Sequence, residues 1–368
     1  MNLQMIIFLV VSLTIIFSAH FAIYKSWVIY LNIDDSSIKK IIAIVLFFLS
    51  VSFIISSILL RNTSNILIKI TYFVSAYWSG LLIYLLLSAF FTWLIVLALK
   101  HTDLNYNQQY ILVMFTALSI AFSVIGLVSS LNPKIKEFDV KIKNLPIAWE
   151  GKSLVQISDM HLGLIYNGRF ADKIIERINQ INPEIVLFTG DYFDGTCPKL
   201  DNLVEPLNNL LTKNAYFISG NHETYIGIDK VQKALSKTNV KLLQDEIIDI
   251  DGLMILGADY PRPSTSKDFK ELFGKLNPDE ANILLYHEPK LREIAKLSGV
   301  DLQLSGHTHK GQFWPYNIFT WLIYGKYHYG LNTDGDYNIY TSNGTGTWGP
   351  PNRFLNRGEI VKITLLRD

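Results

Sequence analysis

The first third of the chain is a succession of long apolar segments. Each is long enough to cross a hydrocarbon layer, which takes about 20 apolar residues in a helix, and together they cover residues 3–24, 41–60, 72–99 and 110–131. The first segment follows no basic residue, exceeds the apolar part of a signal peptide and precedes three more. No charged residue lies in the middle of any segment. We therefore expect residues 1–131 to form a transmembrane anchor of four helices without an ion pathway.

From residue 132 onward, short apolar runs alternate with amphipathic segments. We interpret residues 132–150 as a connector that leaves the membrane and enters a first strand. Runs with the length of buried strands follow at 153–158, 184–189, 215–219, 240–243, 253–256, 282–286 and 301–305. Helices are expected at 169–181, where isoleucines recur at helical spacing, around 203–211 and 231–237, and from Pro289. This alternation predicts one α/β domain over residues 151–368.

Overall composition hides the contrast between the two parts. The chain is 49% hydrophobic and has a formal net charge of +1, so it lacks the basic surface of a nucleic-acid-binding protein, and no nucleic-acid partner is expected. Cys197 is the only cysteine, so no intrachain disulfide forms, which agrees with a reducing compartment.

The basic residues in the loops suggest an orientation in the membrane. One side has Arg61, Lys69, Lys134, Lys136, Lys141 and Lys143, and the other has Lys25, Lys39, Lys40 and Lys100. The larger set normally faces the cytoplasm. We therefore expect both termini and the α/β domain to lie on the cytoplasmic side of a bacterial inner membrane.

Polar side chains follow five of the expected strands at the point where each strand ends. They are Asp159 and His161, Asp191 and Asp194, Asn221 and His222, His287, and His307 with His309. Carboxylates, imidazoles and an amide together suit manganese, iron or zinc, whereas calcium prefers oxygen ligands alone. One ion cannot use so many ligands. Two ions about 3.5–4 Å apart, sharing one carboxylate, would use them and would activate water for attack on phosphorus.

The series D-x-H, GDxxD, GNHE, a lone His and GHTH, in this order, resembles the calcineurin-like metallophosphoesterase superfamily over nearly all of residues 151–368. The resemblance implies a fold of two β-sheets packed as a sandwich and flanked by helices. The anchor and the C-terminal stretch YTSNGTGTWGPPNRFLNRGEIVKITL are similar to bacterial membrane-attached phosphohydrolases of that superfamily, which include relatives acting on UDP-2,3-diacylglucosamine.

The resemblance also implies a role for each polar residue. One metal ion would be held by Asp159, His161, Asp191 and His309, and the other by Asp191, Asn221, His287 and His307, with Asp191 bridging. His222 would protonate the departing oxygen or stabilise the phosphoryl oxygens, and Asp194 would orient His222. Manganese is the expected metal, with iron or zinc as alternatives.

Seven further positions are not assigned as metal ligands. Gly195 stands where the protein Ser/Thr phosphatases of the superfamily have a phosphate-gripping arginine, which argues against that branch. Arg353 and Arg357 suit either a phosphate group or surface salt bridges, and Asn167 and Arg169 have the same ambiguity. Glu223 and Glu288 are interpreted as supporting residues and not as ligands.

Residues 313–329, FWPYNIFTWLIYGKYHY, are the most aromatic part of the α/β domain and directly follow the GHTH motif. Two interpretations are open. The segment is either an apolar plug over the core or a lip that enters the bilayer surface and admits a lipid-borne substrate, since tryptophan and tyrosine have an apolar body and a polar group.

These observations favour a membrane-anchored phosphohydrolase with two divalent ions. Its substrate would contain a phosphodiester or pyrophosphate bond in a lipid or cell-envelope precursor, so its partners are the membrane and a lipid-linked phosphate compound. A UDP-2,3-diacylglucosamine pyrophosphatase of lipid A synthesis is one specific alternative. A catalytically inactive membrane sensor or scaffold is another.

Overall fold

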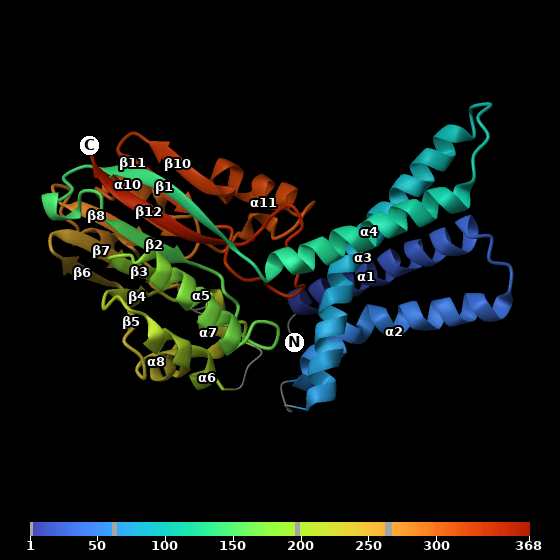
Figure 1. Ribbon diagram of the computed structural model, residues 1–368, viewed down its shortest axis with the longest axis horizontal. Coiled ribbons are helices and arrows are strands. Elements are labelled where there is room, and N and C mark those ends of the chain that lie inside the picture. Colours follow the sequence, from blue (N-terminus) through green and yellow to red (C-terminus); the bar gives the residue numbers. More distant parts are fainter. Residues whose placement is uncertain (1–2, 61–64, 196–198, 262–266) are drawn as a thin grey trace. The chain divides into compact units, whose positions relative to one another are not determined.

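The computed structural model describes residues 3–60, 65–195, 199–261 and 267–368, which form two compact units (Figure 1). The first unit consists of Met1–Leu127 together with Gly349–Asn352, and the second of Val128–Trp348 and Arg353–Asp368. Arg61 and Cys197, which entered the sequence analysis, lie outside the described residues.

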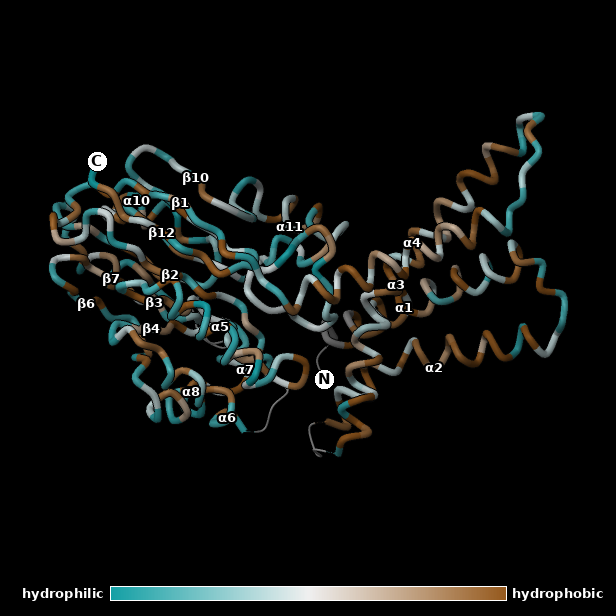
Figure 2. Tube along the Cα trace, viewed as in Figure 1, coloured by the Kyte–Doolittle hydropathy of each residue, from teal (hydrophilic) through white to brown (hydrophobic). Residues whose placement is uncertain are grey.

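The first unit is built from four long helices. They are α1 (Leu3–Tyr30), α2 (Ser36–Leu60), α3 (Ile66–Leu99) and α4 (Gln108–Ser130). All four are long and apolar enough to cross a membrane, and Figure 2 shows the brown stretches that run along them. The predicted four-helix region is thereby confirmed. Each helix begins or ends beyond its apolar segment, because a helix continues into the polar layer, where residues such as Lys25 reach water.

Polar and small residues join the helices of the first unit. The indole nitrogen of Trp78 donates to His20 Nε2 at 3.0 Å, and the hydroxyls of Ser56 and Ser75 lie 2.9 Å apart. Gly126 leaves room for the segment Gly349–Asn352, because a Cβ at position 126 would overlap the Asn352 side chain. Such contacts replace the hydrophobic driving force, which is weak between helices in lipid.

The second unit contains two six-stranded sheets, and their presence confirms the two-sheet fold that the family resemblance implied. The first has the order β1-β12-β2-β3-β4-β5, with bounds β1 Lys134–Ile142, β2 Ser153–Ile157, β3 Ile185–Phe188, β4 Ala215–Phe217, β5 Lys241–Leu242 and β12 Glu359–Arg367. The second has the order β10-β11-β9-β8-β7-β6, with bounds β6 Glu246–Ile250, β7 Leu253–Gly257, β8 Ala281–Leu285, β9 Leu302–Ser305, β10 Gly330–Asp334 and β11 Tyr337–Thr341.

Alternating side chains place the inner strands between two apolar layers. On β3, Ile185 and Leu187 join the cluster between the sheets, whereas Val186 and Phe188 join the cluster beneath the helices. This is the two-residue period of a strand with both faces covered. The first sheet carries α5 (Gly168–Ile181), α6 (Asp201–Val204) and α8 (Ile228–Leu235), and the second carries α9 (Lys270–Phe273) and α10 (Arg292–Leu297).

Two local expectations changed in the structure. The helix expected at 203–211 is divided into α6 and a 3₁₀ turn, Glu205–Asn209, because Pro206 has no N–H to continue an α-helix. The segment 132–150, assigned to a connector, contains β1, which pairs in parallel with β12 along its whole length. Three more helices, α7 (Asn221–Ile226), α9 and α11 (Asn317–Tyr324), were not expected from the sequence.

The five strands that precede the polar motifs are distributed over both sheets. β2, β3 and β4 are parallel neighbours in the first sheet, and β8 and β9 are parallel neighbours in the second. Parallel neighbours end at the same edge, where open sheets bind ligands. The motifs therefore come from one edge of each sheet and not from a single sheet.

Candidate metal centre

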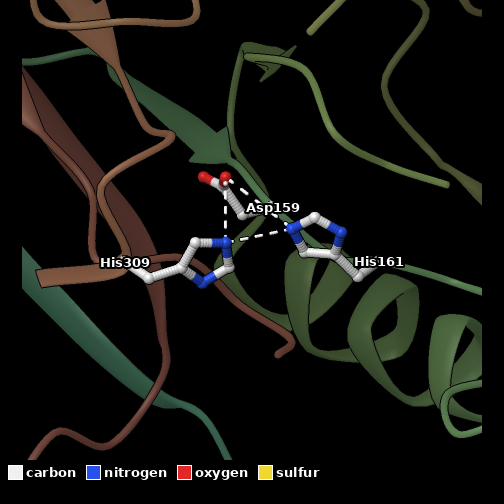
Figure 3. Close-up of side chains that lie close together, drawn as sticks. All are labelled: Asp159, His161 and His309. Atoms are coloured by element: carbon white, nitrogen blue, oxygen red, sulfur yellow. Dashed lines mark hydrogen bonds and ion pairs between the residues drawn. The ribbon is translucent and has the colours of Figure 1, made fainter. Parts of the chain in front are cut away.

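The loops after β2 and β9 bring three predicted ligands together, although 148 residues separate His161 from His309 (Figure 3). The Nε2 atoms of these two histidines lie 3.0 Å apart. Asp159 Oδ1 is 3.3 Å from His309 Nε2 and 4.0 Å from His161 Nε2. All three side chains are buried, and each directs a ligand atom into one small volume.

The loops after β3, β4, β8 and β9 form a second group around Asp191. Asp191 Oδ2 is 3.2 Å from His287 Nε2 and 3.9 Å from His161 Nε2. Asn221 Oδ1 lies 3.0 Å from His307 Nδ1, and the ligand atoms of Asp191, His287 and His307 lie within 4.8 Å of one another. Asp191 thus lies between the two groups, where the sequence analysis expected a bridging carboxylate.

The backbone at the ligand positions is in a conformation that side chains rarely adopt. Positive φ angles of 47° to 69° occur at Asp159, His161, Asp191, His307 and His309. Residues of these types in the left-handed region cost free energy unless the surroundings hold them there, and such residues cluster at functional sites. Main-chain hydrogen bonds hold two of them, because Asp159 N donates to Gly190 O and His161 N to Asp191 O, each at 3.0 Å.

Three glycines allow the loops to approach closely. A Cβ at Gly190 would lie 2.6 Å from His287 Nδ1, and a Cβ at Gly220 would overlap the Asp191 carboxylate. At Gly306 it would overlap Ser158 and Asp159. Glycine is therefore required here for space, and at Gly190 also for its φ of 91°.

Burial and charge control the protonation of the histidines. Burial lowers the pKa of His161 and His309, and burial followed by the charge of His287 lowers that of His307 to about 4. These rings are neutral near pH 7 and keep a lone pair for a cation. Burial also lowers the pKa of His287, but the Asp191 carboxylate outweighs burial and raises this pKa to about 10. A proton on His287 compensates the buried carboxylate, and a divalent cation would compete with that proton.

Two glutamates support the ligands without joining them. Glu223 is buried and accepts main-chain hydrogen bonds from Gly220, Asp191 and Phe193 at 2.7 to 3.2 Å, so it ties the loop after β4 to the loop after β3. Glu288 Oε1 lies 3.3 Å from His307 Nε2 and fixes the ring with Nδ1 toward Asn221. A carboxylate behind a ligating histidine orients the ring in this way.

His222 lies at the same site, with its ring edge-on to that of His161 at 4.6 Å. Its Nδ1 is 3.2 Å from the main-chain oxygen of Asp194, whereas the sequence analysis expected the Asp194 side chain to orient it. The Asp194 carboxylate has an oxygen 3.9 Å from His161 Nδ1. Asp194 thus contacts the two histidines through different atoms.

The sequence analysis left open whether Arg353 binds a phosphate group or forms a surface salt bridge, and it missed the contact of Arg353 with His309. The Arg353 side chain is 1% exposed, so it forms no surface salt bridge. Nη2 lies 3.1 Å from His309 Nδ1 and also donates to Gly346 O, and Nη1 donates to Asn343 O at 2.6 Å. No local signal distinguishes it from Arg357, which donates to Asn132 O at the exposed surface. Asn167 has a structural role, since its side chain accepts from Arg169 N and caps α5.

Three tyrosines pack against the histidines, and the sequence analysis considered only one of them, Tyr324, as part of the aromatic segment 313–329. Tyr225 packs against His222, Tyr260 against His287 and Tyr324 against His307, with ring centroids 5.7 to 6.3 Å apart. Tyr225 lies two residues after the GNHE motif and Tyr324 lies in the segment that follows the GHTH motif, whereas no motif is close to Tyr260 in the sequence.

The donor set fits a pair of divalent cations. Among the described residues, His161 Nδ1 is a buried ring nitrogen without a hydrogen bond, and the nearest polar contact described for His287 Nε2 is its ion pair with Asp191 at 3.2 Å. The glycine positions leave space that a Cβ would fill, and neutral imidazoles, carboxylates and an amide suit manganese, iron or zinc equally.

Comparisons with known proteins agree with this fold and site. The model of the family called calcineurin-like phosphoesterase matches residues 152–311. An uncharacterized metallophosphoesterase of Helicobacter pylori is 35% identical over 244 residues, 64% of each chain. The uncharacterized metallophosphoesterase Cj0846 of Campylobacter jejuni is 34% identical over 290 residues, 75% of each chain. A Danio rerio protein, named transmembrane protein with metallophosphoesterase domain, is 28% identical over 280 residues, 71% of this chain and 63% of its own.

A two-sheet domain with paired histidine–aspartate groups defines the class as metallophosphoesterases. The chain belongs to the calcineurin-like phosphoesterase family. It spans just under two thirds of the Helicobacter and Danio relatives and three quarters of the Campylobacter one. The four apolar helices and the name of the Danio relative support association with a membrane.

Proposed function

We propose that this protein is a membrane-attached, metal-dependent phosphoesterase that hydrolyses a phosphodiester or pyrophosphate bond. The observation that carries the proposal is the position of Asp191, whose Oδ2 lies 3.2 Å from His287 Nε2 and 3.9 Å from His161 Nε2. One carboxylate shared between two groups of nitrogen ligands is the arrangement of a two-ion hydrolytic site.

Two ions would be held by the two residue groups of the sequence analysis. Asp159, His161 and His309 serve one ion, Asn221, His287 and His307 serve the other, and Asp191 serves both. When bound, such ions supply Lewis acidity for the activation of water and positive charge for the phosphoryl oxygens. Manganese is the proposed metal.

His222 is proposed to exchange the proton with the departing oxygen. A carbonyl oxygen only accepts hydrogen bonds, so the contact with Asp194 O places a hydrogen on His222 Nδ1. Nε2 is then the nitrogen that gives or takes the proton. The half-buried ring reaches the site without being enclosed by it, which suits a group that contacts substrate.

The test uses the full chain purified in detergent. After chelation with EDTA, hydrolysis of bis(p-nitrophenyl) phosphate should be absent and should return with manganese, and the metal content should approach two ions per chain. Iron and zinc are tested in parallel. A protein that binds no ions and is indifferent to chelation contradicts the proposal and favours the inactive sensor or scaffold.

The substrate is proposed to be a lipid or cell-envelope precursor, because the spans confine the site to a membrane surface where amphipathic substrates reside. UDP-2,3-diacylglucosamine is one candidate, and release of UMP from it by the manganese-loaded protein is the direct assay. The proposed location is a bacterial inner membrane with the α/β domain in the cytoplasm, on the distribution of loop lysines and arginines. Labelling of a cysteine placed at Leu297 with a membrane-impermeant maleimide checks this orientation in intact cells.

A further inference from the structure

The helix α11 (Asn317–Tyr324) is exposed almost all round, although it is strongly apolar. Ile318, Phe319, Trp321, Leu322 and Ile323 are 50 to 71% exposed, and the helix has no buried residue. A helix on the surface of a soluble domain normally turns one apolar stripe to the core and a polar face to water. Here consecutive positions are apolar and exposed, which indicates a surface that contacts something other than water.

The base of α11 is fixed to the loop of the metal centre. Thr308 Oγ1 donates to His328 O at 2.7 Å, and His328 Nδ1 lies 3.2 Å from Thr320 Oγ1. Tyr324, at the end of the helix, packs its ring perpendicular to that of His307 at 6.3 Å. The inner side of α11 thus adjoins a predicted metal ligand while its outer side remains exposed.

The apolar surface continues beside the helix and is flanked by lysines. Gln312, which lies just before α11 in the chain, forms two hydrogen bonds with the main chain of Trp348. Trp348 is 60% exposed. Lys310 and Lys326 place their ammonium groups over the rings of Tyr329 and Tyr327. Lysines beside an apolar surface suit the phosphates of lipid headgroups.

We propose that α11 and Trp348 enter the interfacial layer of the lipid bilayer. The same chain supplies the reason to choose lipid, because its helices α1–α4 are suited to cross a membrane and only three residues separate the end of α4 at Ser130 from the start of β1 at Lys134. The α/β domain therefore stays at the membrane surface. Tryptophan and tyrosine prefer the headgroup layer, and the exposed aliphatic side chains extend to the acyl boundary.

The proposed contact with lipid would also affect access to the metal centre. This step rests on the proposed function. A lipid-embedded α11 brings His307 and His309 to headgroup depth, where the phosphate of a lipid substrate lies. A lipid-borne substrate then reaches the metal ligands without leaving the bilayer. The contact itself does not depend on catalysis.

The contact is tested by fluorescence in the full chain, reconstituted in nanodiscs. The background is the variant C197S, which removes the only cysteine of the sequence. An environment-sensitive probe is then attached to L322C in one preparation and to I323C in another. The matched control is L297C on α10, where Leu297 is 85% exposed. Spin-labelled phospholipids should quench the probes at 322 and 323 strongly and leave the probe at 297 nearly unchanged. Equal quenching at all positions overturns the proposal. Spontaneous disulfides between L322C chains without quenching also overturn it, because a second copy then covers α11.

A kinetic experiment separates the contact from the reaction. Trp321→Asp and Leu322→Asp should lower hydrolysis of a phosphodiester lipid in vesicles about tenfold or more, since charge opposes burial in the interface, and should change hydrolysis of bis(p-nitrophenyl) phosphate less than about twofold. Equal losses on both substrates contradict an interfacial role. If the unmodified protein hydrolyses neither substrate, the proposed function fails while the quenching experiment still decides the contact.

Discussion

His161 Nε2 and His309 Nε2 lie 3.0 Å apart, at the ends of strands from two different sheets. Neither ring is charged near pH 7, because burial lowers both pKa values, so without a cation the Nε2–H of one ring would donate to the Nε2 of the other, as its tautomer decides. A cation is the partner that would use both lone pairs. The short distance between the two ring nitrogens suits a shared cation, and both residues have positive φ angles, a backbone conformation that clusters at functional sites.

Asp191→Asn should abolish hydrolysis while the fold remains. The amide keeps the shape of the side chain but loses the charge that is shared between the two groups, so turnover should fall by more than about 100-fold. Metal content by mass spectrometry should fall in parallel, with an unchanged circular dichroism spectrum. Retained turnover would refute a bridging carboxylate.

His222→Ala should lower kcat by about 10²–10⁴-fold, the usual contribution of a positioned acid. Because His222 is predicted to act on the departing oxygen and not to hold an ion, the metal content should stay the same. The control is a substrate with a p-nitrophenolate leaving group, which needs little protonation and should lose less rate than an alkyl ester. Loss of one ion per chain would instead make His222 a ligand.

Asp194→Asn should weaken metal binding about 10–100-fold, the effect expected when a group behind a ligating histidine changes. Its carboxylate lies 3.9 Å from His161 Nδ1, whereas His222 is held by the main-chain carbonyl, which the substitution retains. Excess manganese should therefore restore most of the turnover. Activity that stays low at saturating metal would show that the side chain acts on His222 after all.

Gly306→Ala should reduce metal content and stability, because the added Cβ overlaps Ser158 and the Asp159 carboxylate. Overpacking of this kind costs about 1–3 kcal/mol in the free energy of unfolding. The control is Gly335→Ala, where a Cβ would meet no atom within 4 Å but φ is +65°. That variant should lose about 1–2 kcal/mol from backbone strain and keep its metal. Similar metal content in both variants would argue against the close approach.

Asp301→Asn should alter the pH dependence of stability through a carboxyl group that directly precedes β9 and is not one of the predicted metal ligands. Burial raises the pKa of Asp301 to about 7, although its Oδ2 accepts from Asn282 N at 2.7 Å. The folded chain thus binds this proton more tightly than the unfolded chain, whose aspartate has a pKa of about 4. The stability contributed by the proton is complete below about pH 4 and is lost as the pH rises through about 7. The Tm of the variant relative to the parent chain should therefore be higher at pH 8 than at pH 5. A constant difference would contradict the raised pKa.

Much of the fold followed from the sequence because its signals are local. Length and hydropathy identify a span without knowledge of its neighbours, and the strands β2, β3, β8 and β9 are short apolar runs that end in polar motifs. The helix α11 was missed as an element, since its eight residues lack the polar face that gives a surface helix its period. The split of the expected helix at Pro206 shows the opposite error, in which apolar spacing outweighed a residue that cannot continue a helix.

The candidate ligands could be named from motif order, but their supporting contacts could not. Arg353 is a ligand-contacting residue only because the chain after β11 returns to the loop of His309, which no spacing reveals. The contact between His222 and Asp194 likewise depends on which atom of Asp194 the turn presents, and a sequence contains no such information.

The sequence by itself determined which segments are apolar enough for a membrane, which runs form strands and which side chains can bind cations. These properties belong to single residues and their nearest neighbours along the chain. Tertiary structure decided that loops from both sheets deliver the ligands, that Asp191 lies where the family resemblance implied a bridging residue, and that α11 stays exposed. Those outcomes depend on packing between residues far apart in the chain, where burial and close approach set both geometry and protonation.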